Sequence, residues 1–242
     1  MTDKDNSCLA DFLLTDPRDE KIRIEGTNGL LINSFRWILN YSEFERWREG
    51  TGSQLLWIKG SAGKGKTMLM ISIIDELQQR VRSGKSSVTE VLSYFLCQGT
   101  DPRLNTATAI LRGIIYLLAS QQPFLNISHL RQKYHHAGRK LFEDNNAFYS
   151  LSNVFRQMIQ DSRLTTAYLV VDALDECEVG LPELLDLITS TLVTAQPTRV
   201  KWILSSRNRD DIGQRLWLGT LELNLDHIQF RTHKVELPRN LT

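Results

Sequence analysis

The sequence predicts an α/β fold, a three-layer sandwich in which a mostly parallel sheet carries helices on both faces. Short apolar runs alternate with longer amphipathic stretches, as expected for strands joined by crossover helices. A glycine-rich segment follows the first apolar run, and an aspartate ends the third. Both features stand where the carboxyl ends of parallel strands would meet, which is where open α/β sheets bind ligands.

Composition and charge narrow the class of protein. The chain has 242 residues, 41% hydrophobic and 24% charged, which is ordinary for a soluble protein with one large α/β domain or two small ones. Lys and Arg number 29 against 28 acidic residues, and like charges never run to five in succession. Proteins that hold nucleic acid usually carry a clear basic excess, so nucleic acid is not expected as the main partner.

Targeting and redox features favour the cytoplasm. Residues 1–12 are polar and acidic, unlike a secretory signal. The longest apolar stretches, 114–119 and 167–171, are too short to span a bilayer, so no membrane partner is expected. Cys8, Cys97 and Cys177 lie far apart without a CxxC pair, which predicts reduced thiols and no zinc site.

The chain divides into two zones. Residues 1–52 are expected to form a helical linker with two short helices, and Ser42 with Glu45 makes a capping-box pattern that opens the second helix. Residues 53–242 hold the alternating pattern and form the second zone. Its strand candidates are 55–58, 91–97, 168–172, 200–205 and 221–225; its helix candidates are 66–82, 106–120, 147–159 and 181–194. We interpret 123–145 as a helix and a loop outside the sheet, and 229–242 as a short helix with a tail.

The glycine-rich segment matches the phosphate-binding pattern G-x-x-x-x-G-K-[ST] at every fixed position. A triphosphate must be met by several backbone N–H groups at once, and glycines let the loop curl closely around it. A helix beginning at Lys66 would direct its N-terminal N–H groups at the anion. Lys66 would reach the β and γ phosphates, while Thr67 would offer its hydroxyl to Mg²⁺. The predicted nucleotide-binding residues here are Gly60, Ser61, Ala62, Gly63, Lys64, Gly65, Lys66, Thr67 and Met68.

The neighbouring sequence argues against a chance match in an unrelated turn. An apolar run, 55–58, stands directly before the loop, and a helical apolar pattern follows it, so strand, loop and helix come in the required order. Lys64 occupies a variable position of the pattern, where a solvated lysine is the simpler interpretation.

A second strand end carries acidic residues. Asp172 follows four apolar residues and is placed to hold Mg²⁺; the alternative is that it only caps the next helix. Asp175 and Glu176 come shortly after, and either is a candidate to orient the attacking water, with Glu176 preferred. Arg207, after the strand 200–205, would lie beside the γ-phosphate and sense it, unless it is only a surface arginine at a strand exit.

These segments resemble the NACHT family, within the STAND class of signalling NTPases. The residues that carry the resemblance are 60–69 (GSAGKGKTML), 168–177 (YLVVDALDEC) and 202–207 (WILSSR). The small Ala173 after the metal-binding aspartate, with an acidic pair beyond it, is typical of NACHT domains. Residues 16–25, 37–39 and 97–103 are similar to the nucleotide-binding domains of fungal NOD-like receptor proteins.

The resemblance implies a P-loop NTPase sheet of about five parallel strands, with 200–205 between the two motif strands. It also implies an ATP or GTP switch with Mg²⁺, whose nucleotide state controls opening and self-association or contacts with other receptor domains. Arg23 and Ile24 fall in the segment that lines the base pocket in the family. The family's winged-helix element and repeats are not expected within 53–242, so a fragment or a truncated product is implied. We interpret His227 and His233 as surface residues rather than the family's nucleotide clamp.

Three functions remain open from the sequence. A signalling switch that hydrolyses slowly is favoured, because Ala173 stands where faster P-loop ATPases place a catalytic glutamate. A small-molecule kinase would need an arginine-rich lid, which basic residues of 131–140 could supply: Arg131, Lys133, Arg139 and Lys140. A scaffold without turnover is the third. The lack of an Asn-Lys-x-Asp sequence favours ATP over GTP.

Overall fold

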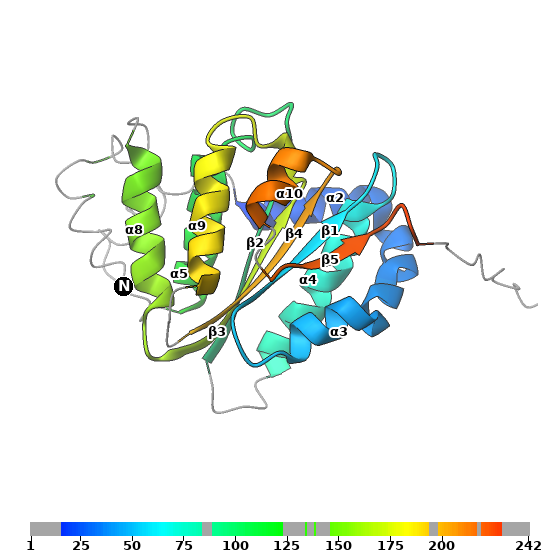
Figure 1. The fold of residues 1–242 in the computed structure, drawn as a ribbon, viewed down its shortest axis with the longest axis horizontal. Helices are drawn as coiled ribbons and strands as arrows, with labels where there is room; N and C mark the ends of the chain where they lie inside the picture. The colour runs from blue at the N-terminus through cyan, green and yellow to red at the C-terminus, as the bar shows by residue number, and fades with distance from the viewer. Residues whose placement is uncertain are drawn as a thin grey trace, which may run out of the picture.

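The computed structural model describes residues 16–83, 89–122, 134, 138, 146–193, 198–216 and 219–228, with the side chains of 28–34 excepted. In chain order the elements are α2 (Pro17–Ile32), η1 (Asn33–Asn40), α3 (Ser42–Glu49), β1 (Gln54–Lys59), α4 (Lys66–Ser83), β2 (Thr89–Leu96), α5 (Ala107–Gln121), α8 (Ala147–Ile159), β3 (Leu164–Asp172), η2 (Leu174–Glu176), α9 (Leu181–Val193), β4 (Arg199–Ser206), α10 (Asp210–Leu216) and β5 (Leu221–Asn224). They are labelled in Figure 1.

All five predicted strands join one sheet in the order β2-β3-β4-β1-β5. Every strand pairing is parallel, so the predicted fold class is confirmed. Strand β4 lies between β1 and β3, as the family resemblance implied. Because the strands are parallel and in register, Lys59 faces Ser206 and Leu96 faces Asp172 at the same edge of the sheet.

The core forms two layers, one on each face of the sheet (Figure 1). Alternate side chains of a strand point to opposite faces, so Leu55 and Trp57 enter one layer while Leu56 and Ile58 enter the other. Helices α5, α8, α9 and α10 cover the first face, and η1, α3 and α4 cover the second. This is the three-layer sandwich that the alternating pattern predicts.

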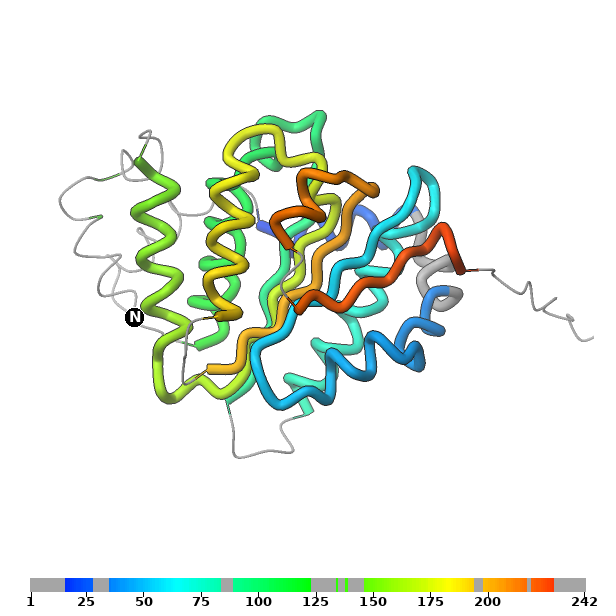
Figure 2. Tube along the Cα trace, in the orientation of Figure 1, coloured from blue at the N-terminus to red at the C-terminus, as the bar shows by residue number. Residues whose placement is uncertain are grey.

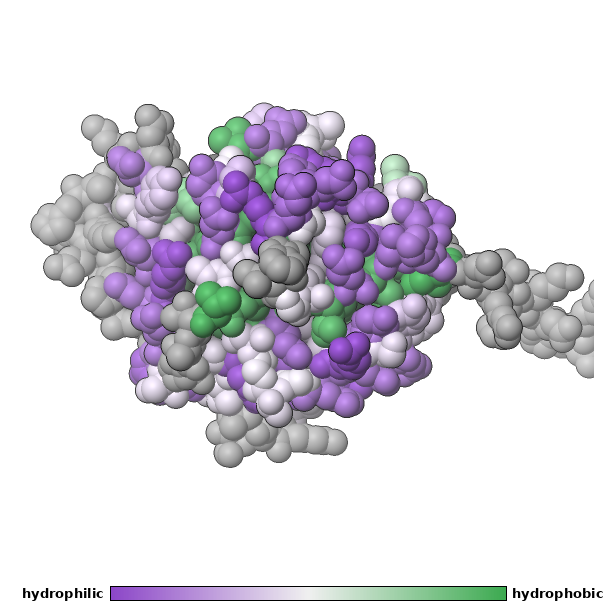
Figure 3. All heavy atoms as spheres, viewed as in Figure 1, coloured by the Kyte–Doolittle hydropathy of each residue, from purple (hydrophilic) through white to green (hydrophobic). Residues whose placement is uncertain are grey.

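The four predicted helices of the second zone are present, and α10 is an addition that the sequence did not predict. The predicted segments 123–145 and 229–242 lie outside the described residues, apart from Tyr134 and Gly138. Among the described residues, no helix is both long and apolar enough to cross a membrane. The face shown in Figure 3 is mostly hydrophilic, with apolar areas that are small and separate.

The N-terminal zone packs on the sheet through η1 and α3. Ile38, Phe44 and Trp47 are fully buried in the same layer as β1 and α4. The predicted capping box at Ser42 is wrong, because α3 already includes Ser42 and its N-cap is Tyr41, which makes no side-chain cap bond. The Ser42 hydroxyl instead donates to Glu43 Oε2 at 2.6 Å. The proposed division after residue 52 stays a prediction.

Candidate functional site

The glycine-rich loop joins the end of β1 to the start of α4. Gly63 and Gly65 have φ angles of 76° and 77°, a region that side chains other than glycine rarely adopt. A Cβ atom at Gly65 would also lie 2.5 Å from Cζ of Phe35, so this position excludes any side chain. Helix α4 begins at Lys66, as predicted, and its first N–H groups therefore face the concave side of the loop.

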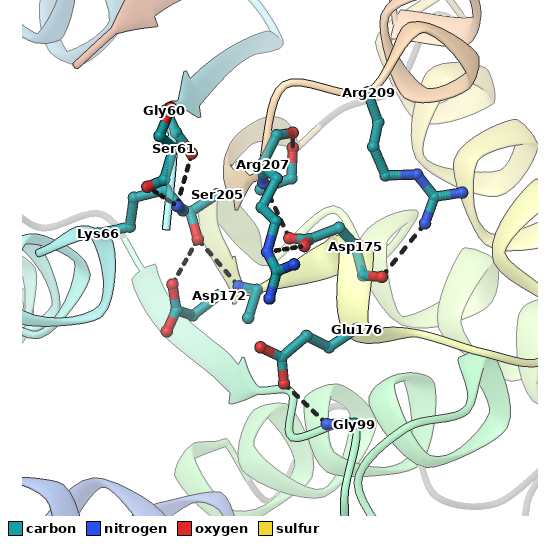
Figure 4. Close-up of polar contacts among 12 residues, drawn as sticks. Gly60, Ser61, Lys66, Gly99, Asp172, Asp175, Glu176, Ser205, Arg207 and Arg209 are labelled. Carbon is teal, nitrogen blue, oxygen red and sulfur yellow. Dashed lines mark hydrogen bonds and ion pairs between the residues drawn. The ribbon is translucent and has the colours of Figure 1, made fainter. Parts of the chain in front are cut away.

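Lys66 closes the loop on itself. Its Nζ donates to the carbonyl of Gly60 at 2.7 Å and to that of Ser61 at 3.0 Å (Figure 4). Gly60 N in turn donates to the Ser206 carbonyl at 3.3 Å, which ties the start of the loop to β4. The ammonium is thus held across the mouth of the loop, where a phosphate oxygen can exchange for a carbonyl.

Asp172 ends β3 with a carboxylate that is only 2% exposed. The Ser205 hydroxyl donates to Asp172 Oδ1 and accepts the Ala173 N–H at 2.9 Å. Burial raises the pKa of Asp172, because the charged form is poorly solvated there. Hydrogen bonds from the hydroxyls of Ser205 and Thr67 oppose that rise, as does the positive charge of Lys66.

The same contacts place the predicted metal ligands together. Thr67 is in the first turn of α4 and Asp172 closes β3, yet the threonine hydroxyl lies close enough to the carboxylate to lower its pKa. Ser205 lies between Lys66 and Asp172 in Figure 4. Both side chains offer hard oxygen atoms, and a buried carboxylate gains from a nearby cation. The pair fits Mg²⁺, which typically takes one or two protein ligands and leaves the other positions to phosphates and water.

The two candidate water-orienting carboxylates have different partners. Asp175 Oδ1 accepts the backbone N–H of Arg207 at 2.9 Å, and Oδ2 pairs with Arg207 Nε at 3.3 Å. Glu176 Oε2 accepts the N–H of Gly99 at 2.7 Å (Figure 4). Arg207 therefore contacts both carboxylate oxygens of Asp175, whereas Gly99 holds Glu176 through one carboxylate oxygen.

The loop after β3 carries backbone strain. Ala173 has φ 52° and ψ 46°, the left-handed conformation, and no other described residue except glycine has a positive φ. This turn directs the chain from Asp172 into η2 and so sets where Asp175 and Glu176 lie. Such conformations cost free energy and are common at functional sites.

Three residues at the site were not predicted. Ser205 falls within the predicted strand 200–205 and was not predicted to have a role of its own, although a polar side chain at a strand end is a usable signal. Arg209 Nη1 donates to the Asp175 carbonyl at 3.2 Å, and Asp226 accepts from Ser61. Nothing in the local sequence pointed to these last two contacts, because each joins segments that are distant along the chain.

Other predicted residues have partners outside the group around Lys66 and Asp172. Arg23 pairs with Glu20 on its own helix and is 57% exposed, and Ile24 packs against the layer that contains β1. Their base-pocket role stays a prediction. Lys64 Nζ lies 3.9 Å from Asp226 Oδ1, and His227 is exposed. The following predicted residues lie outside the described residues: Cys8, Arg131, Lys133, Arg139, Lys140 and His233.

Comparison with known proteins gives two kinds of match. Residues 33–207 match the family model described as nephrocystin 3, N-terminal. The vegetative incompatibility protein HET-E-1 of Podospora anserina is 50% identical over 232 residues, which make up 93% of this chain and 16% of HET-E-1. The chain thus spans only a small part of the length of that relative.

Solved structures give more distant likenesses. The ORC1 protein of Aeropyrum pernix, in complex with DNA, is 17% identical with a TM-score of 0.49, covering 82% of this chain and 44% of its own. The ORC2 protein of the same organism is 14% identical with a TM-score of 0.44, covering 80% and 46%. Likenesses this distant carry no argument about function.

Proposed function

Because the chain belongs to the nephrocystin 3 N-terminal family, we propose that it binds ATP, or GTP, with Mg²⁺ and hydrolyses it slowly as a signalling switch. The family match and the 50% identity to HET-E-1 confirm the resemblance to NACHT-type domains of fungal NOD-like receptor proteins. The observation that carries the proposal is the convergence of Lys66, Thr67 and Asp172 at the carboxyl edge of the sheet.

Each of these residues has a role that its position supports. The N–H groups of the loop and of the first turn of α4 would surround the β-phosphate, and Lys66 would exchange the carbonyls of Gly60 and Ser61 for phosphate oxygens. Thr67 and Asp172 would hold Mg²⁺, which supplies charge neutralisation between the β and γ phosphates. Ser205 holds the Asp172 carboxylate in place through its hydroxyl.

Glu176 is the better candidate to orient water. Both oxygens of Asp175 accept from Arg207, so this carboxylate is suited to positioning the arginine near the γ-phosphate. Glu176 is anchored to Gly99 through one oxygen, which leaves the other for a water molecule. The residue directly after Asp172 is Ala173, so water must be held from further along the loop, and slow turnover follows.

No observation favours the kinase alternative, since the basic residues expected for its lid lie outside the described residues. The scaffold alternative is less favoured, because the chain has Lys66, Thr67, Asp172 and the acidic pair of residues 175 and 176. We further propose that the protein is cytoplasmic, and that its self-association, or its contacts with other receptor domains, depends on the bound nucleotide.

The test is nucleotide binding by calorimetry together with phosphate release, with ATP and GTP compared in the presence of Mg²⁺. Lys66→Ala should abolish measurable binding, and Glu176→Gln should bind normally while releasing phosphate about a hundredfold more slowly. Glu178→Gln is the matched control, an exposed glutamate two positions along. Binding that survives Lys66→Ala, or turnover unchanged by Glu176→Gln, would contradict the assignment. Phosphate transfer to an added acceptor would favour the kinase.

A further inference from the structure

The turn after β5 lies beside the loop that follows β1 (Figure 2), and it places the Asp226 carboxylate on Ser61 of that loop. Leu225 N donates to the Lys59 carbonyl at 2.8 Å, and Asp226 N donates to Asn224 Oδ1 at 3.0 Å, so the turn is tied to β1 and folded on itself. Both carboxylate oxygens of Asp226 lie 3.1 Å from Ser61 N, and Oδ2 also accepts from the Ser61 hydroxyl at 3.0 Å.

Ser61 connects this carboxylate to the predicted phosphate-binding lysine. Its N–H and hydroxyl donate to Asp226, while its carbonyl accepts from Lys66 Nζ at 3.0 Å. The Ser61 N–H and the Gly60 carbonyl belong to one peptide group, and that carbonyl accepts from Lys66 Nζ at 2.7 Å. This peptide is held on both sides, so the carboxylate fixes a carbonyl on which the lysine ammonium rests.

Neighbouring groups stabilise the negative charge of the Asp226 carboxylate. The N–H of Ser61 lowers its pKa most, and the positive charges of Lys64 and Lys66 act in the same direction. An ionised carboxylate accepts stronger hydrogen bonds than a neutral group does. The hydrogen bonds of Asp226 go to Ser61, at the start of the loop, so we expect anchoring to outweigh repulsion of a phosphate.

We propose that Asp226 is a positioning residue that anchors the phosphate loop through Ser61. It lies in the turn that follows the edge strand β5, so a segment at the edge of the sheet acts on Lys66 through Ser61. The ligand that the loop would bind is the nucleotide of the proposed function, so this inference rests on the proposed function for its ligand. The anchoring itself is a property of the chain without ligand, which allows the two to be tested apart.

The first experiment is hydrogen exchange of residues 59–66 without nucleotide, in Asp226→Ala and Asp226→Asn. The alanine should speed exchange at the Ser61 amide about three- to tenfold, since it removes the acceptor of that N–H. The asparagine keeps an oxygen acceptor and should restore most of the protection. Glu222→Ala is the matched control: Glu222 lies on β5 and pairs with Lys59 of β1 at 2.6 Å, so this variant removes a nearby carboxylate but leaves the contacts of Ser61 with Asp226 in place.

The second experiment is the affinity for ATP with Mg²⁺ of the same variants. Asp226→Ala should bind about three- to tenfold more weakly, Asp226→Asn should lie within about twofold of the wild type, and Glu222→Ala should be unchanged. A loss of melting temperature common to Asp226→Ala and Glu222→Ala, with equal affinities, would show a merely structural role and overturn the proposal. Tighter binding in both Asp226 variants would also overturn it, because the carboxylate would then be repelling phosphate.

The outcomes separate this inference from the proposed function. Faster exchange in Asp226→Ala, together with a wild type that binds neither ATP nor GTP, would reject the proposed function and support the anchoring. Suppose instead that exchange is unchanged in Asp226→Ala, while the wild type binds nucleotide and Lys66→Ala does not. That outcome would support the proposed function and reject the anchoring. If the wild type binds nucleotide and Asp226→Ala exchanges faster but binds with the same affinity, the contact of Asp226 with Ser61 does not serve binding. That result also overturns the proposal.

Discussion

Replacing Ser205 by alanine should cost far more stability than the loss of one hydroxyl suggests. Ser205 is fully buried, donates to Asp172 Oδ1 and accepts from Ala173 N at 2.9 Å. Alanine leaves a buried carboxylate oxygen and a backbone N–H without these partners. Removing one partner of a buried polar group costs about 1–3 kcal/mol, so the two together should lower the free energy of unfolding by about 2–4 kcal/mol.

Ser93→Ala is the matched control for this loss. Ser93 is also a fully buried strand serine, but its hydroxyl makes a single bond, to the Ile114 carbonyl at 2.8 Å within α5. That carbonyl keeps its place in the helical ladder, so the control should lose only about 0.5–1.5 kcal/mol. The expected difference between the variants is about 2 kcal/mol, or roughly 4–8 °C in melting temperature for a domain of this size.

Urea unfolding and thermal melting, both without nucleotide, measure this difference directly. Ser205→Ala should also shrink the stabilisation that Mg²⁺ and ATP produce, because Asp172 is no longer held in place by the Ser205 hydroxyl. If the two serine variants lose equal stability, Ser205 does not satisfy both groups, and the account of how Asp172 is oriented is refuted.

Two further predictions concern the same turn. Ala173→Gly should stabilise the protein by about 0.5–1 kcal/mol, since relief of a left-handed alanine exceeds the added chain entropy of glycine, while Ala109→Gly within α5 should lose about 1 kcal/mol. Equal losses in urea unfolding would contradict the strain. Asp172→Asn should gain stability relative to the wild type as pH rises above 3.8, because the raised pKa of Asp172 makes the folded wild type bind more protons than the unfolded chain in that window. Urea titrations from about pH 4 to pH 7 measure the gap between the two proteins, and a gap that does not change with pH would show that Asp172 ionises freely in the fold.

Much of the fold could be predicted because its signals are local. Apolar runs such as 55–58 and 200–205 are bounded by polar residues and glycines, so their strands were found with small errors at the ends. The phosphate loop was visible for the same reason, since its glycines and Lys66 stand in one short pattern. The position of β4 between the motif strands is not local, and it came from the family resemblance.

The rest could not be predicted because it depends on contacts between distant segments. Asp226 meets Ser61 because β5 pairs with β1, and Arg209 meets the Asp175 carbonyl from the segment between β4 and α10. Helix α10 was not predicted because it is seven residues long and buries only Ile212 and Leu216, too few for a helical pattern of apolar residues. The different partners of Asp175 and Glu176 likewise depend on where β4 and the Gly99 loop end, which no short pattern records.

The site carries two electrostatic costs that a ligand would relieve. Asp172 is a buried carboxylate with a raised pKa, and Lys66 rests on carbonyls that offer only partial charge. A divalent cation at Asp172 and a polyphosphate at Lys66 would each supply the opposite charge that the fold lacks. Because Asp172 bonds to residues of α4 and β4, these gains would be shared by three elements of the sheet edge. Occupancy would then change the stability of that whole edge of the sheet.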